Sequence, residues 1–140
     1  MKQLKALLIA IGVVGLAANA AEAGSLGKQL AELESHINWS AVDSAWKSIR
    51  PGWLRTAAGC DEAACVAAQL LRLEQNVKWQ AVDKAWRERR DGWVNDCKSA
   101  STEAAVAKLL LEFEANVRWR AVDQEWKARR EGWLADVSGD

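Results

Sequence analysis

The sequence has few of the residues on which catalytic and metal sites depend. It holds one His, three Cys and no Tyr in 140 residues, and the Cys form no C-x-x-C pair. A zinc site is therefore not expected, because such sites draw on several His and Cys ligands. No Ser-His-Asp set, glycine-rich phosphate loop or paired-carboxylate motif is present either. We predict a protein that is not an enzyme and that binds no metal or cofactor.

The sequence also lacks an excess of charge of either sign. It contains 19 basic and 19 acidic residues. Without residues 1–23, which include Lys2, Lys5 and Glu22, the chain has 17 basic and 18 acidic residues. A net charge near zero gives no electrostatic attraction to nucleic acid or to an anionic membrane. Nucleic acid is therefore not an expected partner.

Residues 1–23 have the layout of a secretory signal peptide. A basic start, M-K-Q-L-K, precedes an apolar run from Ala6 to Ala18 and small residues that offer A-x-A cleavage sites. The run is too short and too rich in Ala and Gly to favour a membrane span. We expect cleavage after Ala23, which leaves residues 24–140 as a single periplasmic or secreted domain with no stable membrane span. An oxidising compartment would permit disulfides.

A stretch of 15 residues occurs three times, with a period of 40 residues. It reads W-S-A-V-D-S-A-W-K-S-I-R-P-G-W at 39–53, W-Q-A-V-D-K-A-W-R-E-R-R-D-G-W at 79–93 and W-R-A-V-D-Q-E-W-K-A-R-R-E-G-W at 119–133, and it contains all nine Trp. A fixed period of this length indicates one supersecondary building block for each unit. The predicted units are 25–59, 60–99 and 100–138.

The apolar residues before each Trp stretch recur at helical spacing. In the second unit Val66, Leu70, Leu73 and Val77 follow a 4-3-4 pattern, which the other two units repeat. The sequence therefore predicts an all-α protein, a compact helical bundle built from three Trp-rich repeats. The apolar stripes before and after position 77 are out of phase. Each unit is thus either one long helix that changes its buried face or, as we prefer, a hairpin.

Two sequence features bear on the ends of the helices. Asn76 and its counterpart Asn116 could end the first helix of a hairpin in the left-handed conformation. Gly precedes the third Trp of each unit, and Gly suits the position after a helix end. In the first unit Pro51 would also break a continuous helix. These features predict a buried first and second Trp in each unit and an exposed third Trp, namely Trp53, Trp93 and Trp133.

Three Cys allow three disulfide pairings, each of which leaves one Cys over. Cys60 and Cys65 bracket the start of the second unit, where a junction between loop and helix lets two Cys five residues apart meet. A hairpin would instead bring Cys97 back towards Cys60. Cys60–Cys65 is the first choice. The remaining thiol, Cys97 in that case, could be free or could join two copies of the chain.

One segment resembles a known family. The stretch W-L-x5-C-D-E-A-A-C-V from Trp53 to Val66, with L-A-E-L-E at 30–34 upstream, is similar to the exported, helical lysozyme inhibitor LprI-like proteins. The resemblance covers roughly residues 30–75 and departs from the family at Pro51 and Gly52, where the family has Gln-Arg. It implies a Cys60–Cys65 disulfide, a helix-packing role for Trp53 and lysozyme as a candidate partner.

Three hypotheses for function follow from these observations. The first is an exported, non-enzymatic binding protein that engages a protein partner, with lysozyme as the candidate. Its contact surface would consist of the third Trp of each unit and the adjoining Arg residues, namely Trp53, Trp93, Trp133, Arg90 and Arg130. The second is a structural or self-assembling module with all its Trp in the core, in which Cys97 could link two copies. The third is binding of a glycan such as peptidoglycan through exposed Trp.

Overall fold

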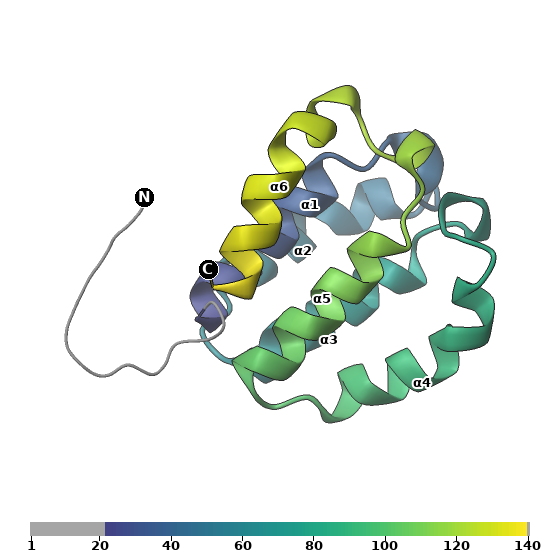
Figure 1. Ribbon diagram of the computed structural model, residues 1–140. Coiled ribbons are helices and arrows are strands. Elements are labelled where there is room, and N and C mark those ends of the chain that lie inside the picture. Colours follow the sequence, from purple (N-terminus) through teal and green to yellow (C-terminus); the bar gives the residue numbers. More distant parts are fainter. Residues whose placement is uncertain (1–21, 140) are drawn as a thin grey trace.

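Each 40-residue unit folds as a helical hairpin in the computed structural model, which describes residues 22–139 (Figure 1). A 3-10 turn separates the two helices of every hairpin. The elements are α1 (Ala23–Ser35), η3 (Trp39–Ala41), α2 (Trp46–Gly59), α3 (Ala63–Gln75), η4 (Trp79–Ala81), α4 (Trp86–Ser99), α5 (Glu103–Ala115), η5 (Trp119–Ala121) and α6 (Gln124–Ser138). The prediction of an all-α bundle is confirmed, and the units are hairpins rather than long helices.

The structure describes only the last two residues, 22 and 23, of the predicted signal peptide. Residues 1–21, which carry its basic start and its apolar run, lie outside the described residues. Among residues 22–139, no helix has the length and apolar character needed to cross a membrane.

The first helix of a hairpin ends without a left-handed residue. Asn76 has φ −104° and ψ 4°, and Asn116 has φ −101° and ψ 1°, so the predicted left-handed ends are wrong. The Asn side chains serve in another way. Nδ2 of Asn76 donates to the carbonyl of Arg72 at 2.9 Å, and Nδ2 of Asn116 donates to the carbonyl of Glu112 at 2.8 Å. Each amide thereby contacts a carbonyl in the last turn of the helix, where carbonyls lack helical partners.

The three hairpins close into a ring with pseudo-three-fold symmetry. Short extended segments beside the 3-10 turns pair in single antiparallel bridges, Val42 with Val77, Val82 with Val117 and Ile37 with Val122. The last of these joins the third hairpin to the first. The first helices α1, α3 and α5 contact one another around the pseudo-axis. Each second helix packs between its own first helix and the first helix of the next hairpin in the ring.

The second helices supply most of the aromatic core. Trp46 and Trp53 of α2 are 0% and 1% exposed, and their rings lie 5.2 Å apart, a spacing that α4 and α6 repeat. The predicted helix end at the Gly before the third Trp is wrong, because α2 runs through Pro51 and Gly52 to Gly59. Pro51 lies on the exposed side, so the carbonyl that it leaves without an N–H partner can be hydrated. A continuous helix places both Trp, seven residues apart, on the face towards the core.

Gly27 is required by the close approach of α1 to α2. A Cβ atom at this position would lie 2.1 Å from the carbonyl oxygen of Ala57, whereas one at Gly92 within α4 would meet nothing within 4 Å. Gly27→Ala is therefore expected to destabilise the protein by about 1–3 kcal/mol, because the two helices must separate. Gly92→Ala should stabilise it by about 0.5–1 kcal/mol, because Ala favours the helix. Urea unfolding of both variants checks this, and shifts of the same sign would contradict it.

Candidate binding sites at the exposed tryptophans

A buried carboxylate ties the two helices of each hairpin together. Glu74 on α3 is 5% exposed. Its Oε2 accepts from Nε1 of Trp86 at 3.0 Å and from Nε of Arg90 at 2.6 Å, and its Oε1 accepts from Nη2 of Arg90 at 2.9 Å. Glu114, Trp126 and Arg130 repeat this arrangement in the third hairpin. The regular spacing of Glu, Trp and Arg in the repeat therefore serves to hold the two helices of a hairpin together.

This network revises the predicted role of Arg90 and Arg130. Both guanidinium groups pair with a carboxylate inside their own hairpin, and that hydrogen bond is the main cause of the raised pKa of each Arg. Their charges are largely neutralised within the fold, so they are not free to meet an acidic partner as we expected. The same Arg side chains also lie over an exposed Trp, as described next.

The exposed Trp of each unit is the first one and not the third. Trp39, Trp79 and Trp119 are 51%, 48% and 51% exposed, and they are the exposed large hydrophobic residues of the described chain. Two cations lie over each ring. Over Trp79, the guanidinium carbons of Arg87 and Arg90 are 5.2 Å and 5.7 Å from the ring centroid. Such cation–π contacts hold the indole in place on the surface.

A small pocket adjoins each exposed Trp. The three pockets have volumes of about 200, 190 and 150 Å³ in hairpins one, two and three, respectively. Each is lined by the buried Glu of the hairpin, the exposed Trp, two apolar side chains and the Arg of the network. In the second hairpin the lining residues are Glu74, Gln75, Val77, Trp79, Val82 and Arg90. Each pocket thus combines an aromatic surface with hydrogen-bonding groups.

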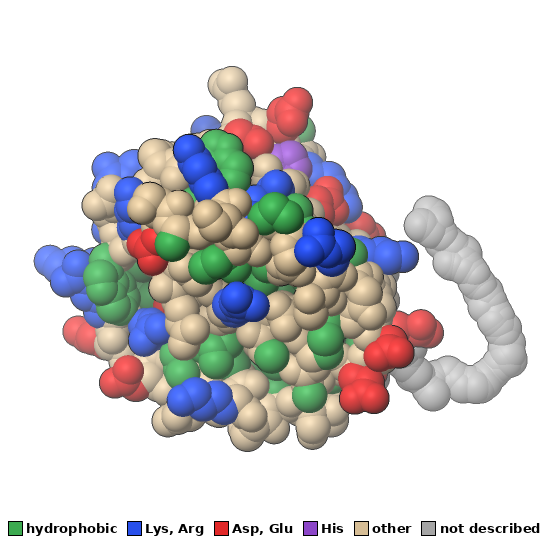
Figure 2. Space-filling model, turned by 180° about the vertical axis from the view of Figure 1, so that it is seen from behind, with side chains coloured by type: hydrophobic (Ala, Val, Ile, Leu, Met, Phe, Trp, Pro, Cys, Tyr) green, Lys and Arg blue, Asp and Glu red, His purple; other side chains and the backbone are tan. Residues whose placement is uncertain are grey.

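A further hollow lies where the three 3-10 turns meet on the pseudo-axis. It has a volume of about 390 Å³ and is lined by Ser40, Ala41, Gln80, Ala81, Arg120 and Ala121. Backbone hydrogen bonds of 2.8–2.9 Å from Asn38, Lys78 and Arg118 to the carbonyls of Ala121, Ala41 and Ala81 connect the turns. Figure 2 shows hydrophobic side chains beside Lys and Arg side chains on the visible surface. Each of the three 3-10 turns begins with its exposed Trp, so this end of the ring presents exposed Trp beside the cations that lie over them.

The third Trp of each unit fastens one hairpin to the next. Trp53, Trp93 and Trp133 are 1%, 3% and 0% exposed, so the prediction that they form a contact surface is wrong. Their Nε1 atoms donate to the carbonyls of Gln69, Leu109 and Gln29, at 2.9, 3.1 and 2.8 Å, respectively. Each acceptor belongs to the following hairpin in the ring, and the bond from Trp133 to Gln29 closes it. A Trp in this position cannot meet a partner protein.

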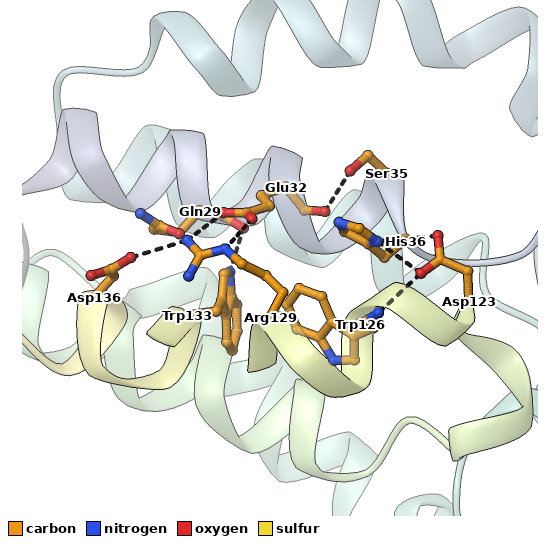
Figure 3. A network of polar contacts seen from close by, with 9 residues as sticks. All are labelled: Gln29, Glu32, Ser35, His36, Asp123, Trp126, Arg129, Trp133 and Asp136. Carbon is orange, nitrogen blue, oxygen red and sulfur yellow. Dashed lines mark hydrogen bonds and ion pairs between the residues drawn. The ribbon is translucent and has the colours of Figure 1, made fainter. Parts of the chain in front are cut away.

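The seam that closes the ring is rich in polar contacts (Figure 3). Arg129 of α6 pairs with Glu32 of α1, with Nη2 donating to Oε1 at 3.0 Å, and it also pairs with Asp136. These hydrogen bonds raise the pKa of Arg129. Nδ1 of His36 lies 2.8 Å from Oδ1 of Asp123. The sequence alone does not reveal this seam, because the partners lie 87 to 97 residues apart and no local pattern connects them.

The same seam contains one group of possible metal ligands. His36, Asp123 and Glu125 place ligand atoms within 4.8 Å of one another. His36 is already paired with Asp123, whose Oδ1 also accepts from the backbone N–H of Trp126 at the start of α6. These contacts account for His36 and Asp123 without an ion.

The cysteines adopt one of the three possible pairings. Cys60 and Cys65 form a disulfide with an S–S distance of 2.03 Å across the junction between α2 and α3. Cys97 is free and only 4% exposed. Burial is the main cause that raises the pKa of its thiol to about 12, so the thiol is protonated at neutral pH.

Cross-linking of two copies through Cys97 would require the fold to open. The self-assembly hypothesis loses both of its premises, since three Trp are also exposed.

Comparison with known proteins found one family model that matches part of the chain. The model of a domain of unknown function, DUF8799, matches residues 64–118. These residues cover nearly all of α3 and the whole of η4, α4 and α5, and they end just before η5. No curated protein and no solved structure matches the chain.

Proposed function

We propose that this chain is an exported, non-enzymatic binding protein that holds saccharide rings of a cell-envelope glycan on Trp39, Trp79 and Trp119. The observation that carries the proposal is the half-exposed Trp in an equivalent pocket of each hairpin. A large aromatic ring left in water gives up the stabilisation that its burial would bring, whereas six other Trp of the same chain are buried.

The chemistry of the pockets suits a sugar. An indole provides a flat apolar surface for the C–H face of a pyranose, and the adjoining carboxylate and guanidinium groups can bind hydroxyl groups. Volumes of 150–200 Å³ suit one ring at a time better than they suit a protein surface. Three similar sites on one chain would also gain avidity for a polymer with repeating units.

Two observations support export. The first 23 residues have the composition of a signal peptide. The Cys60–Cys65 disulfide suits an oxidising compartment such as the periplasm or the extracellular medium.

The hydrogen bonds of the pocket carboxylates support a protein that is not an enzyme. Each of these carboxylates accepts from Trp and Arg donors, which suits a structural role better than proton transfer; they are Glu34, Glu74 and Glu114.

The test uses chitotetraose, a soluble neutral oligosaccharide, and peptidoglycan fragments as probes. Binding is measured by calorimetry and by Trp fluorescence for the wild type and for the triple variant with Trp39, Trp79 and Trp119 changed to Ala. We expect the triple variant to lose affinity at least about tenfold, which is about 1.4 kcal/mol. Arg120→Ala, an exposed change at the same end, serves as the control. Equal affinity of the triple variant and the wild type would contradict the proposal.

A second candidate function is binding of lysozyme as a protein partner. The Cys60–Cys65 disulfide and the buried, packed Trp53 favour it, since the resemblance to LprI-like proteins implies both. Lysozyme activity on cell walls is measured with and without the oxidised mature protein. Dose-dependent inhibition that is lost on reduction would support this function. Full activity at a large molar excess of the protein would remove lysozyme as the partner.

A further inference from the structure

The pocket of the first hairpin differs from the other two at one buried atom. Oε2 of Glu34 accepts from Nε1 of Trp46 at 2.9 Å and from Nε of Arg50 at 2.7 Å, as in the other hairpins. Its Oε1 is buried and has no hydrogen-bond donor among the described residues. The corresponding oxygens of Glu74 and Glu114 each accept from Arg Nη2 at 2.9 Å. A buried carboxylate oxygen without a donor is rare and costly.

We propose that this pocket is the selective subsite of the protein, in which a neutral saccharide stacks its ring on Trp39 and a small shift of the Glu34 side chain lets a hydroxyl group of the saccharide donate a hydrogen bond to the buried Oε1. The inference rests on the proposed function, because it assigns a ligand class to one of the three Trp pockets. The other two pockets then provide stacking on Trp79 and Trp119 and add avidity.

The geometry of the pocket fits this ligand. Glu34 is 4% exposed and lines the pocket of about 200 Å³ together with the half-exposed Trp39. Ser35 lines the same pocket, and its hydroxyl donates to the carbonyl of Glu32 at 2.7 Å, which leaves its oxygen able to accept. A second hydroxyl of the ligand can donate there. The equivalent positions, Gln75 and Ala115, differ in chemistry.

The charges around Trp39 favour a neutral ligand. Nζ of Lys47 and Cζ of Arg50 lie 5.5 Å and 5.6 Å from the centroid of the Trp39 ring, so a cationic ligand would be repelled. The Glu34 carboxylate pairs with Arg50, so Lys47 leaves the surroundings of Trp39 with a net positive charge. A hydroxyl group can donate to the carboxylate without repulsion from this charge, which favours a neutral sugar over a protonated amino sugar.

The experiment compares Glu34→Gln with Glu74→Gln. Both changes remove a buried carboxylate from an equivalent pair of Trp and Arg donors, and thermal unfolding of each variant measures its effect on the fold. We expect Glu34→Gln to weaken the binding of chitotetraose at least tenfold and Glu74→Gln to weaken it less than twofold. Equal losses in the two variants would overturn the inference.

A second comparison does not disturb the core. Trp39→Ala should weaken the binding of chitotetraose more than Trp79→Ala or Trp119→Ala does. Equal effects of the three changes would overturn the selective subsite and leave the proposed function standing. No binding of chitotetraose or of peptidoglycan fragments by the wild type at millimolar concentration would instead contradict the proposed function itself.

The charge preference has its own probe. The glucosamine tetramer has the chitotetraose backbone with protonated amino groups in place of neutral acetamido groups. We expect it to bind at least tenfold more weakly than chitotetraose at a pH at which its amines are charged. Tighter binding of the charged tetramer would overturn the assignment to a neutral ligand.

Discussion

Trp126→Ala is expected to lower the free energy of unfolding by about 3–5 kcal/mol, as in other large-to-small core changes. Trp126 is 1% exposed and packs against the ring of Trp133 at 5.2 Å. Its Nε1 also donates to the buried Glu114 at 3.0 Å, so the change removes a donor from a carboxylate as well as volume from the core. The measurement is urea unfolding followed by far-ultraviolet circular dichroism.

The matched control for this prediction is Trp119→Ala in the same hairpin. Trp119 is half exposed, and it contributes chiefly through its contacts with Lys127 and Arg130. A loss of about 0.5–1 kcal/mol is expected, which is the size of an exposed cation–π contact. Comparable losses in the two variants would contradict the assignment of Trp126 to the core and Trp119 to the surface.

The sequence predicts the fold class well because its apolar period is a local property. Residues such as Val66, Leu70 and Leu73 report helical spacing directly, and all three are buried in α3. The prediction of which Trp is exposed is wrong, because the same spacing of seven residues separates the first Trp from the second and the second from the third. Only the latter pair shares a helix. An extended segment around Val42 interrupts the helical spacing between Trp39 and the next Trp, and no residue type in the sequence predicts this interruption.

The closure of the ring lies beyond the reach of sequence patterns. A 40-residue period is equally consistent with an open stack of hairpins and with a closed ring, since the two differ in the rotation between neighbours. The decisive contacts join residues 104 positions apart for Trp133 and Gln29 and 87 apart for His36 and Asp123. The difference between Glu34 and its two counterparts is also invisible in the sequence, because every unit carries the same Glu, Trp and Arg at this site.

The repeated carboxylate network leads to the second large effect. Glu74→Ala is expected to destabilise the protein by about 3–5 kcal/mol, because it leaves the guanidinium of Arg90 and the indole N–H of Trp86 without their buried acceptor. Glu62→Ala, at an exposed position before α3, should cost less than about 0.5 kcal/mol and is the control.

A double-mutant cycle assigns this cost to the network. If the buried pair is the cause, Glu74→Ala combined with Arg90→Ala should be less destabilising than the sum of the two single changes, with a coupling of about 0.5–3 kcal/mol. Additive losses would mean that Glu74 acts through Trp86 or through packing and not through Arg90. A loss below about 1 kcal/mol for Glu74→Ala would contradict the role of the carboxylate. Because all three hairpins use this network, that result would also weaken the assignment of Glu34 as a residue whose second oxygen is held ready for a ligand.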